Sequence, residues 1–207
     1  MPTSSCAEYV ASLLAEGAFR LGEIQVTPDF SLSHREDAGK DDLEVSTDPW
    51  KALEIARYDD GGRYRALKTA ANLRHGWRLQ LADSSEVLTA LDFFYPAAIG
   101  MMVAHQAGNL TATPLRVTLE RQSGMYAVVR KLNGEQAVAV VSRLCCGAVP
   151  CLRRKIWSLT CDGPPLESVT RNTPGQREVP LLCSEACNLF VAAGRHVVKG
   201  DPAPAGE

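Results

Sequence analysis

The chain has 207 residues, of which 45% are hydrophobic and 22% are charged, a composition typical of folded globular proteins. Its 22 basic and 24 acidic residues give a formal net charge of −2, without the basic excess of a nucleic-acid-binding protein, so we expect no nucleic-acid partner. No apolar run reaches the roughly 18 residues of a membrane span, and the N-terminus lacks the pattern of a secretory signal. We therefore expect a cytoplasmic protein without membrane association.

The beginning of the chain predicts a small antiparallel sheet preceded by a helix. The helix is expected over residues 6–17, where the apolar residues share one face. Residues 19–26 alternate between apolar and polar, with a change of phase at Gly22, which predicts one strand with a glycine bulge. Two further strands are expected over 30–34 and 43–45, on either side of a charged turn. Together these segments predict an antiparallel meander.

The following segments alternate between helix and strand signals. Asp48 followed by Pro49 is typical of a helix start. Residues 76–82 alternate as a fourth strand would. Asp-Ser-Ser-Glu has the spacing of a capping box and predicts a helix over 83–94, and a second apolar helix is expected over 97–106.

From Thr113 onward the pattern is mostly helical. The residues at 133–136 resemble a capping box in front of an apolar segment at 137–143. The periodicity of 126–132 fits a strand and a helix equally well. Residues 161–180, rich in Pro, Gly, Ser and Thr, are expected to form a long loop.

These elements predict the α+β class and two domains. The first, over 1–110, combines a small antiparallel sheet with helices, and the second, over 111–200, is mostly helical. The last seven residues, 201–207, are rich in Pro, Ala and Gly and are expected to be a disordered tail.

The cysteines indicate a metal site in the second domain. Cys6 stands alone near the N-terminus, whereas the other six of the seven fall between Cys145 and Cys187. In a reducing cytoplasm they are not expected to form disulfides. In a protein without a metal site, we expect cysteines to be spread over the helices and strands. Their concentration in one region therefore predicts metal binding.

The best ligand set is Cys146, Cys151, Cys183 and Cys187, because four thiolates are the usual ligands of an iron–sulfur cluster. Cys146 and Cys151 flank a turn with a glycine and a proline, where the backbone can wrap around an inorganic core. Cys183 and Cys187 are four residues apart. If both lie in the first turn of the last helix, their Cβ atoms are roughly 5–6 Å apart, and the positive helix end favours thiolates.

The spacing of the cysteines alone is compatible with other ligand sets. Cys145 competes with Cys146, because adjacent side chains rarely reach the same cluster, and Cys161 could replace one ligand or stand as a free thiol. The spacing matches neither ferredoxin pattern nor a zinc ribbon. Structural zinc, or no metal at all, is therefore also compatible with the cysteine pattern.

Five segments of the chain resemble one known family. They are 67–77 (LKTAANLRHGW), 94–100 (FYPAAIG), 121–126 (RQSGMY), 151–154 (CLRR) and 180–189 (PLLCSEACNL). They resemble the iron–sulfur proteins that are associated with sirohydrochlorin cobaltochelatases, fused to the chelatase or beside it. The resemblance implies that a small α+β stabilising domain precedes a 4Fe–4S cluster-binding domain.

The resemblance also implies ligands and a function. Cys183 and Cys187 would be cluster ligands, and Cys151 and one of Cys145 or Cys146 would complete the set. The implied function is that of an accessory 4Fe–4S protein acting with a sirohydrochlorin chelatase in cobalamin or siroheme tetrapyrrole metallation. The cluster would pass electrons, sense redox state or hold the domain in shape. A zinc-stabilised protein-interaction module without a redox role is the alternative function.

The sequence predicts no independent catalytic activity. A chelatase domain, which would need histidines on an α/β scaffold, is not found in these residues, and no phosphate loop or nucleophile motif is present. The four histidines are scattered singly and are expected to be surface or packing residues, with His75 as the exception to watch. Lys68, Arg74 and His75 could bind the carboxylates of a tetrapyrrole, or could simply close a turn.

Overall fold

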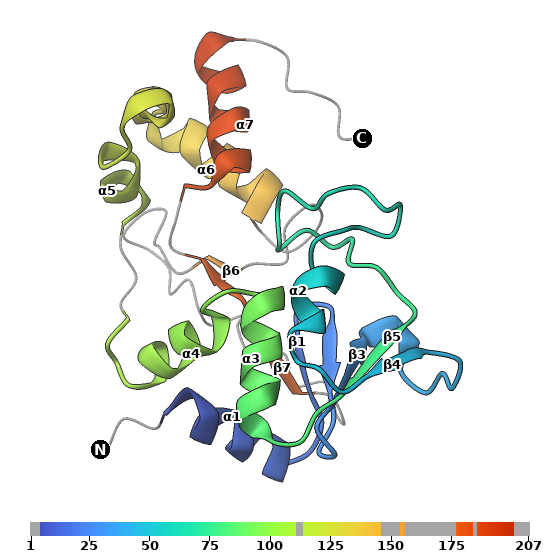
Figure 1. The fold of residues 1–207 in the computed structure, drawn as a ribbon. Coiled ribbons are helices and arrows are strands. Elements are labelled where there is room, and N and C mark those ends of the chain that lie inside the picture. The colour runs from blue at the N-terminus through green and yellow to red at the C-terminus, as the bar shows by residue number, and fades with distance from the viewer. Residues whose placement is uncertain (1–4, 111–113, 146–153, 156–176, 184–185, 201–207) are drawn as a thin grey trace. The chain divides into compact units, whose positions relative to one another are not determined.

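The structure is a computed structural model with two compact units. It describes residues 5–110, 114–145, 154–155, 177–183 and 186–200 (Figure 1). The first unit comprises the chain up to Leu110 together with the segment that ends at Leu181, and the second unit comprises the rest. The predicted tail lies outside the described residues.

Six strands form the sheet of the first unit, in the order β4-β5-β3-β2-β1-β7. Their bounds are β1 (Phe19–Leu21), β2 (Ile24–Val26), β3 (Ser31–His34), β4 (Glu44–Ser46), β5 (Trp77–Gln80) and β7 (Arg177–Val179). The inner neighbours are antiparallel, whereas the two edge strands join in parallel, β4 to β5 and β7 to β1. The α+β class is confirmed, and the sheet is mixed where only antiparallel pairs were expected.

The segment predicted as one bulged strand is a hairpin. Gly22 has φ +60° and stands first in a two-residue turn between β1 and β2, so the chain reverses there. The ring of Tyr95 also lies so close that a Cβ on Gly22 would be 2.6 Å from it. The backbone N–H of Glu23 donates to the Tyr95 hydroxyl at 2.9 Å, which fixes the turn against the following helices.

The predicted meander is wrong because β5 lies between β3 and β4. Leu32 of β3 is paired with Leu79 of β5, and both side chains are fully buried. In β4, by contrast, Val45 is 56% exposed. The more apolar strand therefore occupies the interior of the sheet, where it gains hydrophobic burial, and β4 is left at the edge.

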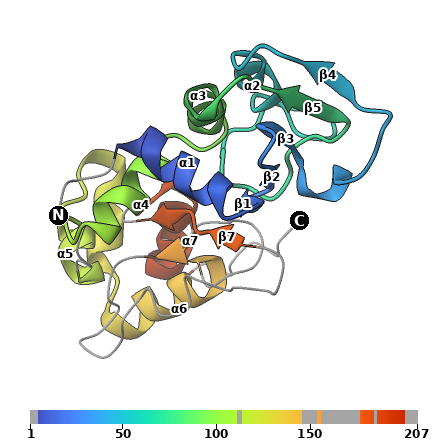
Figure 2. The same cartoon turned by 90° about the horizontal axis from the view of Figure 1, so that it is seen from below.

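Helices cover the apolar face of this sheet. They are α1 (Cys6–Ala15), α2 (Lys51–Ile55), α3 (Ser84–Phe94) and α4 (Ala98–Gln106), and a 3-10 turn, η1 (Arg35–Asp37), follows β3. Figure 2 shows α1 and α3 on the same side of the strands, and the Trp77 ring of β5 stacks on Phe94 of α3 at 5.0 Å. A capping box at Ser5 begins α1, and the Asp83 carboxylate caps α3.

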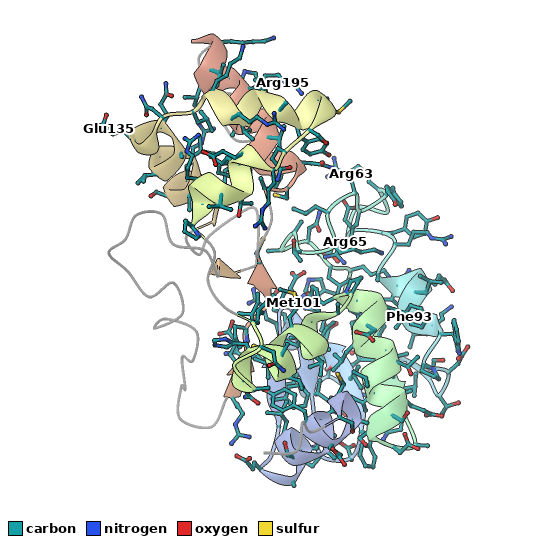
Figure 3. All side chains as sticks on the ribbon, turned by 90° about the vertical axis from the view of Figure 1, so that its left-hand side faces the viewer. Arg63, Arg65, Phe93, Met101, Glu135 and Arg195 are labelled. Carbon is teal, nitrogen blue, oxygen red and sulfur yellow. The ribbon has the colours of Figure 1, made fainter. Side chains whose placement is uncertain are left out.

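A second aromatic contact lies between the N-cap residue of α2 and a residue of α3. Trp50 precedes α2 and is 63% exposed, and its ring lies 5.0 Å from that of Phe93. Figure 3 labels Phe93 on α3.

The second unit is mostly helical, as the sequence predicts. Its elements are α5 (Leu115–Glu120), η2 (Gly124–Lys131), α6 (Gly134–Cys145), α7 (Asn188–Lys199) and the two-stranded sheet of β6 (Arg154–Lys155) and β8 (Leu182–Cys183). The segment whose periodicity left strand and helix open is the 3-10 helix η2. The predicted long loop contains β7, which pairs with β1 in the first unit.

The apolar faces of these helices meet in one core. Its buried members include Leu119 of α5, Val129 of η2, Val141 of α6 and Phe190 of α7. A Cβ on Gly194 of α7 would lie 3.0 Å from Val129, so a side chain at this point would disturb the packing of α7 on η2. Figure 3 shows α6 and α7 beside each other.

Among the described residues, no single helix has both the length and the apolar composition that a membrane crossing requires. The pair α3 and α4 reaches both only when the two helices are taken together, and they are bent by 109°.

Candidate metal centre

Cys183 lies in the second strand of the small sheet in the second unit. It is buried, and its backbone is the register partner of Lys155. Arg154 and Lys155 follow Cys151 by three and four residues in the sequence. The pairing of β6 with β8 therefore brings the chain that follows one predicted ligand next to another predicted ligand.

Cys187 occupies the N-cap of α7. Its carbonyl oxygen accepts the first helical hydrogen bond, from Val191 N–H at 2.9 Å, while its thiol makes no capping bond. The side chain is half-buried, and it packs against the helical core. The thiol therefore stands at the positive end of a helix dipole, where negative charge is stabilised.

The expectation that Cys183 and Cys187 share the first turn of a helix is wrong. Cys183 belongs to β8, and α7 begins only at Asn188. Cys183 therefore lies in extended backbone, in a strand that pairs in parallel with β6. The two thiols therefore come from two consecutive elements.

Apolar side chains pack against both cysteines. Cys183 belongs to the buried core, together with Ala186 and Phe190, and Cys187 packs at its margin. The hydroxyl of Tyr126 donates to the side-chain oxygen of Asn188 and so joins η2 to the start of α7. This setting keeps water away from one side of the thiols, a property that tunes metal centres.

The remaining predicted ligands are placed only in part. Cys145 is the last residue of α6, which packs against α7. Cys146, Cys151 and Cys161 lie outside the described residues.

The described donors fit an iron–sulfur cluster. Cys183 of a strand belongs to the apolar core, and Cys187 of a helix N-cap packs against it. The helix α6, which ends at Cys145, packs against α7, and β6 pairs with β8. Thiolates are the ligands that such clusters use, and the N-terminus of α7 complements their negative charge. Cys183 and Cys187 would hold the cluster, with partners that the sequence assigns to Cys151 and to Cys145 or Cys146.

The first unit contains a second concentration of ionisable groups. The carboxylate of Glu23 is buried; it accepts the N–H of Leu73 at 3.0 Å and lies 3.6 Å from the guanidinium of Arg65. Nε2 of His34, also buried, lies 3.5 Å from the same carboxylate. Arg65 in turn donates to the Asn72 side chain and to two backbone carbonyls, and thereby folds the loop between α2 and β5.

His75 lies where this network reaches the surface. Its Nε2 is 3.2 Å from Asp60 and its Nδ1 is 3.6 Å from Asp37. Burial disfavours the charged form of Asp37, but hydrogen bonds from the Lys40 ammonium and from Gly76 N–H outweigh it, and the pKa of the carboxyl is lowered. His75 also lines a surface opening of about 460 Å³, together with Asp59, Asp60 and Arg74.

Two sequence interpretations change here. The histidines are not all single, because the rings of His34 and His75 lie 3.8 Å apart between centroids. Lys68, which was grouped with Arg74 and His75, instead donates to the carbonyl of Ala56 at 2.8 Å, and burial lowers its pKa. Sequence reasoning missed Glu36, Asp37 and Asp60, although the run His34-Arg-Glu-Asp was a signal that could have been used.

Comparison with protein-family models gives two adjacent matches. Residues 7–106 match the DR2241 stabilising domain, and residues 107–196 match a 4Fe–4S iron–sulfur cluster binding domain. A comparison with curated proteins finds no match. These assignments favour an iron–sulfur cluster over structural zinc in the second unit.

A solved structure is similar over almost the whole chain. It is the crystal structure of DR2241 from Deinococcus radiodurans, with a TM-score of 0.72 and 31% sequence identity. The match covers 94% of this chain and 41% of that one, so the chain spans about two fifths of the length of DR2241. DR2241 is described as a multi-domain protein with structural similarity to chelatases and with two additional novel domains.

Proposed function

Because the chain belongs to the two-domain family of 4Fe–4S iron–sulfur proteins, we propose that it acts as an accessory iron–sulfur protein of a sirohydrochlorin chelatase. The reaction served would be metal insertion into a tetrapyrrole for cobalamin or siroheme. The observation that carries the proposal is the match to DR2241, in which chelatase-like structure and two additional domains occur in one protein. Both domains matched here are other than the chelatase, which would be fused to them or lie beside them.

The residues of the second unit support the cluster part of this proposal. Cys183 and Cys187 supply thiolates, and Cys151 and either Cys145 or Cys146 would complete the set. When bound, such a cluster supplies reversible one-electron chemistry. The chain itself contributes the apolar core beside the thiols, the α7 dipole and the β6–β8 pairing that holds Cys183 in place.

The charges of the stabilising domain bear on which protein binds the tetrapyrrole. The substrate of such an enzyme carries several carboxylates, and the sequence offered Lys68, Arg74 and His75 either to bind them or to close a turn. In the structure Arg74 lines an opening that also contains Asp59 and Asp60. Because these carboxylates repel a polyanion, we propose that the chelatase, and not this opening, holds the tetrapyrrole.

The cluster is tested by anaerobic purification of the full chain, with iron and sulfide quantitation and EPR of the dithionite-reduced protein. We expect about four irons and four sulfides per chain, in line with a 4Fe–4S centre held by four cysteines. Stoichiometric zinc without iron or sulfide would contradict the proposal.

The partnership is tested separately, with purified sirohydrochlorin chelatase and cobalt insertion as the readout. We expect the cluster-loaded protein to bind the chelatase and to change its rate, and Arg74→Ala to leave tetrapyrrole binding unchanged. Absence of both binding and rate effect, with the cluster intact, would exclude the accessory role and leave the cluster assignment standing.

A further inference from the structure

A set of metal-ligand atoms converges in the first unit, far in sequence from the cysteines. One ring nitrogen each from His34 and His75 and one carboxylate oxygen of Glu36 lie within 4.8 Å of one another. His34 ends β3, Glu36 follows in η1, and His75 stands just before β5, which pairs with β3. The sheet therefore holds the two histidines together across a sequence separation of 41 residues.

We propose that His34, Glu36 and His75 form a binding site for a divalent transition metal such as Zn²⁺, Co²⁺, Ni²⁺ or Fe²⁺. Two imidazoles and one carboxylate suit these ions, and a three-residue set leaves coordination positions open. Alkaline-earth ions, which prefer oxygen ligands only, are not expected to bind here. The proposal is independent of the cluster and of the chelatase partnership.

The surroundings of His34 favour it as a ligand. Its Nε2 faces the buried Glu23 carboxylate at 3.5 Å, which leaves Nδ1 as the ligand atom. Nδ1 accepts the backbone N–H of Glu36 at 3.2 Å, and a bound metal ion would replace that hydrogen bond. A carboxylate on the second nitrogen is the usual device that fixes the tautomer and the orientation of a metal-binding histidine. Glu23 is itself held by Leu73 N–H, so the support is rigid.

The charges around His75 favour a cation. Its Nε2 faces Asp60 at 3.2 Å and Glu36 at 4.0 Å. Asp37, on the Nδ1 side, is already paired with Lys40 at 2.6 Å. An ion bound at Nε2 would therefore meet carboxylate oxygens as further ligands, and Asp60 is the nearest.

An ion can reach the side chains of this proposed metal site from solvent. The His75 side chain is 33% exposed and that of Glu36 is 61% exposed, while His34 is buried beneath them. The opening beside His75 also contains Asp60, whose carboxylate attracts cations, and Asp59, which is paired with Arg63. Arg74 lines the opening as well. The site thus combines a rigid inner ligand with two accessible outer ones.

The test is a Zn²⁺ titration of the protein with its iron–sulfur cluster in place, by isothermal calorimetry, with bound metal counted after gel filtration. His75→Asn and Glu36→Gln should each weaken binding by at least roughly 10–100-fold, the loss that outer-shell partners alone already cause. The matched controls are His105→Asn in α4 and Glu120→Gln in α5. Neither residue belongs to the proposed His34, Glu36 and His75 site, so both variants should leave the affinity for Zn²⁺ unchanged. Both test residues are partly exposed, so the variants are expected to fold.

X-ray absorption at the zinc edge gives a second readout. The proposal requires nitrogen and oxygen ligands at about 2.0–2.2 Å and no sulfur at about 2.3 Å. Unchanged affinity in both variants would mean that His75 is only an ion-paired imidazole, and would overturn the site. A sulfur shell, or loss of binding only in cysteine variants, would place the zinc on the thiols and would overturn it equally.

Discussion

The two units bury their polar groups in different ways. In the first, the buried charges of Glu23, Arg65 and Asp37 are compensated by side chains and backbone groups of the same unit. Among the described residues of the second, the buried polar side chain is Thr118, and the core ends in the thiol of Cys183. We therefore expect the first unit to fold without a metal. The second is expected to need its cluster, because metal binding and folding are coupled in such domains.

The largest effect is expected from removing a cluster ligand. Cys187→Ser or Cys183→Ser should abolish the visible absorption of the cluster and increase hydrogen exchange throughout α6 and α7, with α1 and α3 unchanged. Cys6→Ser is the control, since Cys6 lies in α1 and should leave the cluster intact. Slow exchange in α7 without a cluster would show that the second unit also folds unaided.

Removing one buried aromatic ring from each unit should show whether the two cores unfold independently. Phe94→Ala should destabilise the first unit and Phe190→Ala the second, each by about 3–5 kcal/mol, because each removes a fully buried ring. Denaturant unfolding followed by hydrogen exchange of each unit measures both. Equal loss in both units from either variant would mean that they unfold as one cooperative block.

Gly22→Ala should destabilise the first unit through two costs, a positive φ and a clash with the Tyr95 ring. Gly39→Ala is the matched control, because Gly39 also has positive φ but no atom within 4 Å of the position that a Cβ would occupy. The extra loss in Gly22→Ala should be about 1–3 kcal/mol, the usual cost of overpacking. Equal thermal shifts in the two variants would show that the ring moves aside.

A smaller effect is expected on the stability of the first unit at alkaline pH. Burial raises the pKa of Tyr95 far above its ordinary value, so the folded state favours the protonated phenol. Its contribution is complete below about pH 10 and declines as the pH rises above the pKa of the unfolded phenol, by about 1.4 kcal/mol per pH unit. Tyr95→Phe should flatten this decline in the first unit, followed by near-ultraviolet circular dichroism, and an unchanged slope would exclude Tyr95 as its source.

Local signals made much of the fold predictable. The helices expected over 83–94 and 97–106 are observed as α3 and α4, because caps and apolar spacing are written within each segment. Pairing between distant strands was not predictable in the same way. β7 contains only Arg-Glu-Val, and nothing within those residues indicates that their partner is β1.

The same distinction applies to the sites. The thiols of Cys183 and Cys187 stood out because cysteine is rare and clustered. Cys187 stands at the start of the last helix, but Cys183 lies in a strand and not in the first helical turn. The contact between His34 and His75 depends on the β3–β5 register, which the predicted meander excluded. A site built by non-local pairing is therefore hidden until the order of the strands is known.

The path of the chain through β7 limits how the protein can be divided. A fragment that stops at Leu110 would lack β7 and would leave β1 as an open edge with unpaired N–H and C=O groups. Such an edge invites aggregation, so an insoluble fragment would say little about the intrinsic stability of the unit. Supplying residues 177–181 through a short linker would restore the missing hydrogen-bond partner and give a fairer specimen.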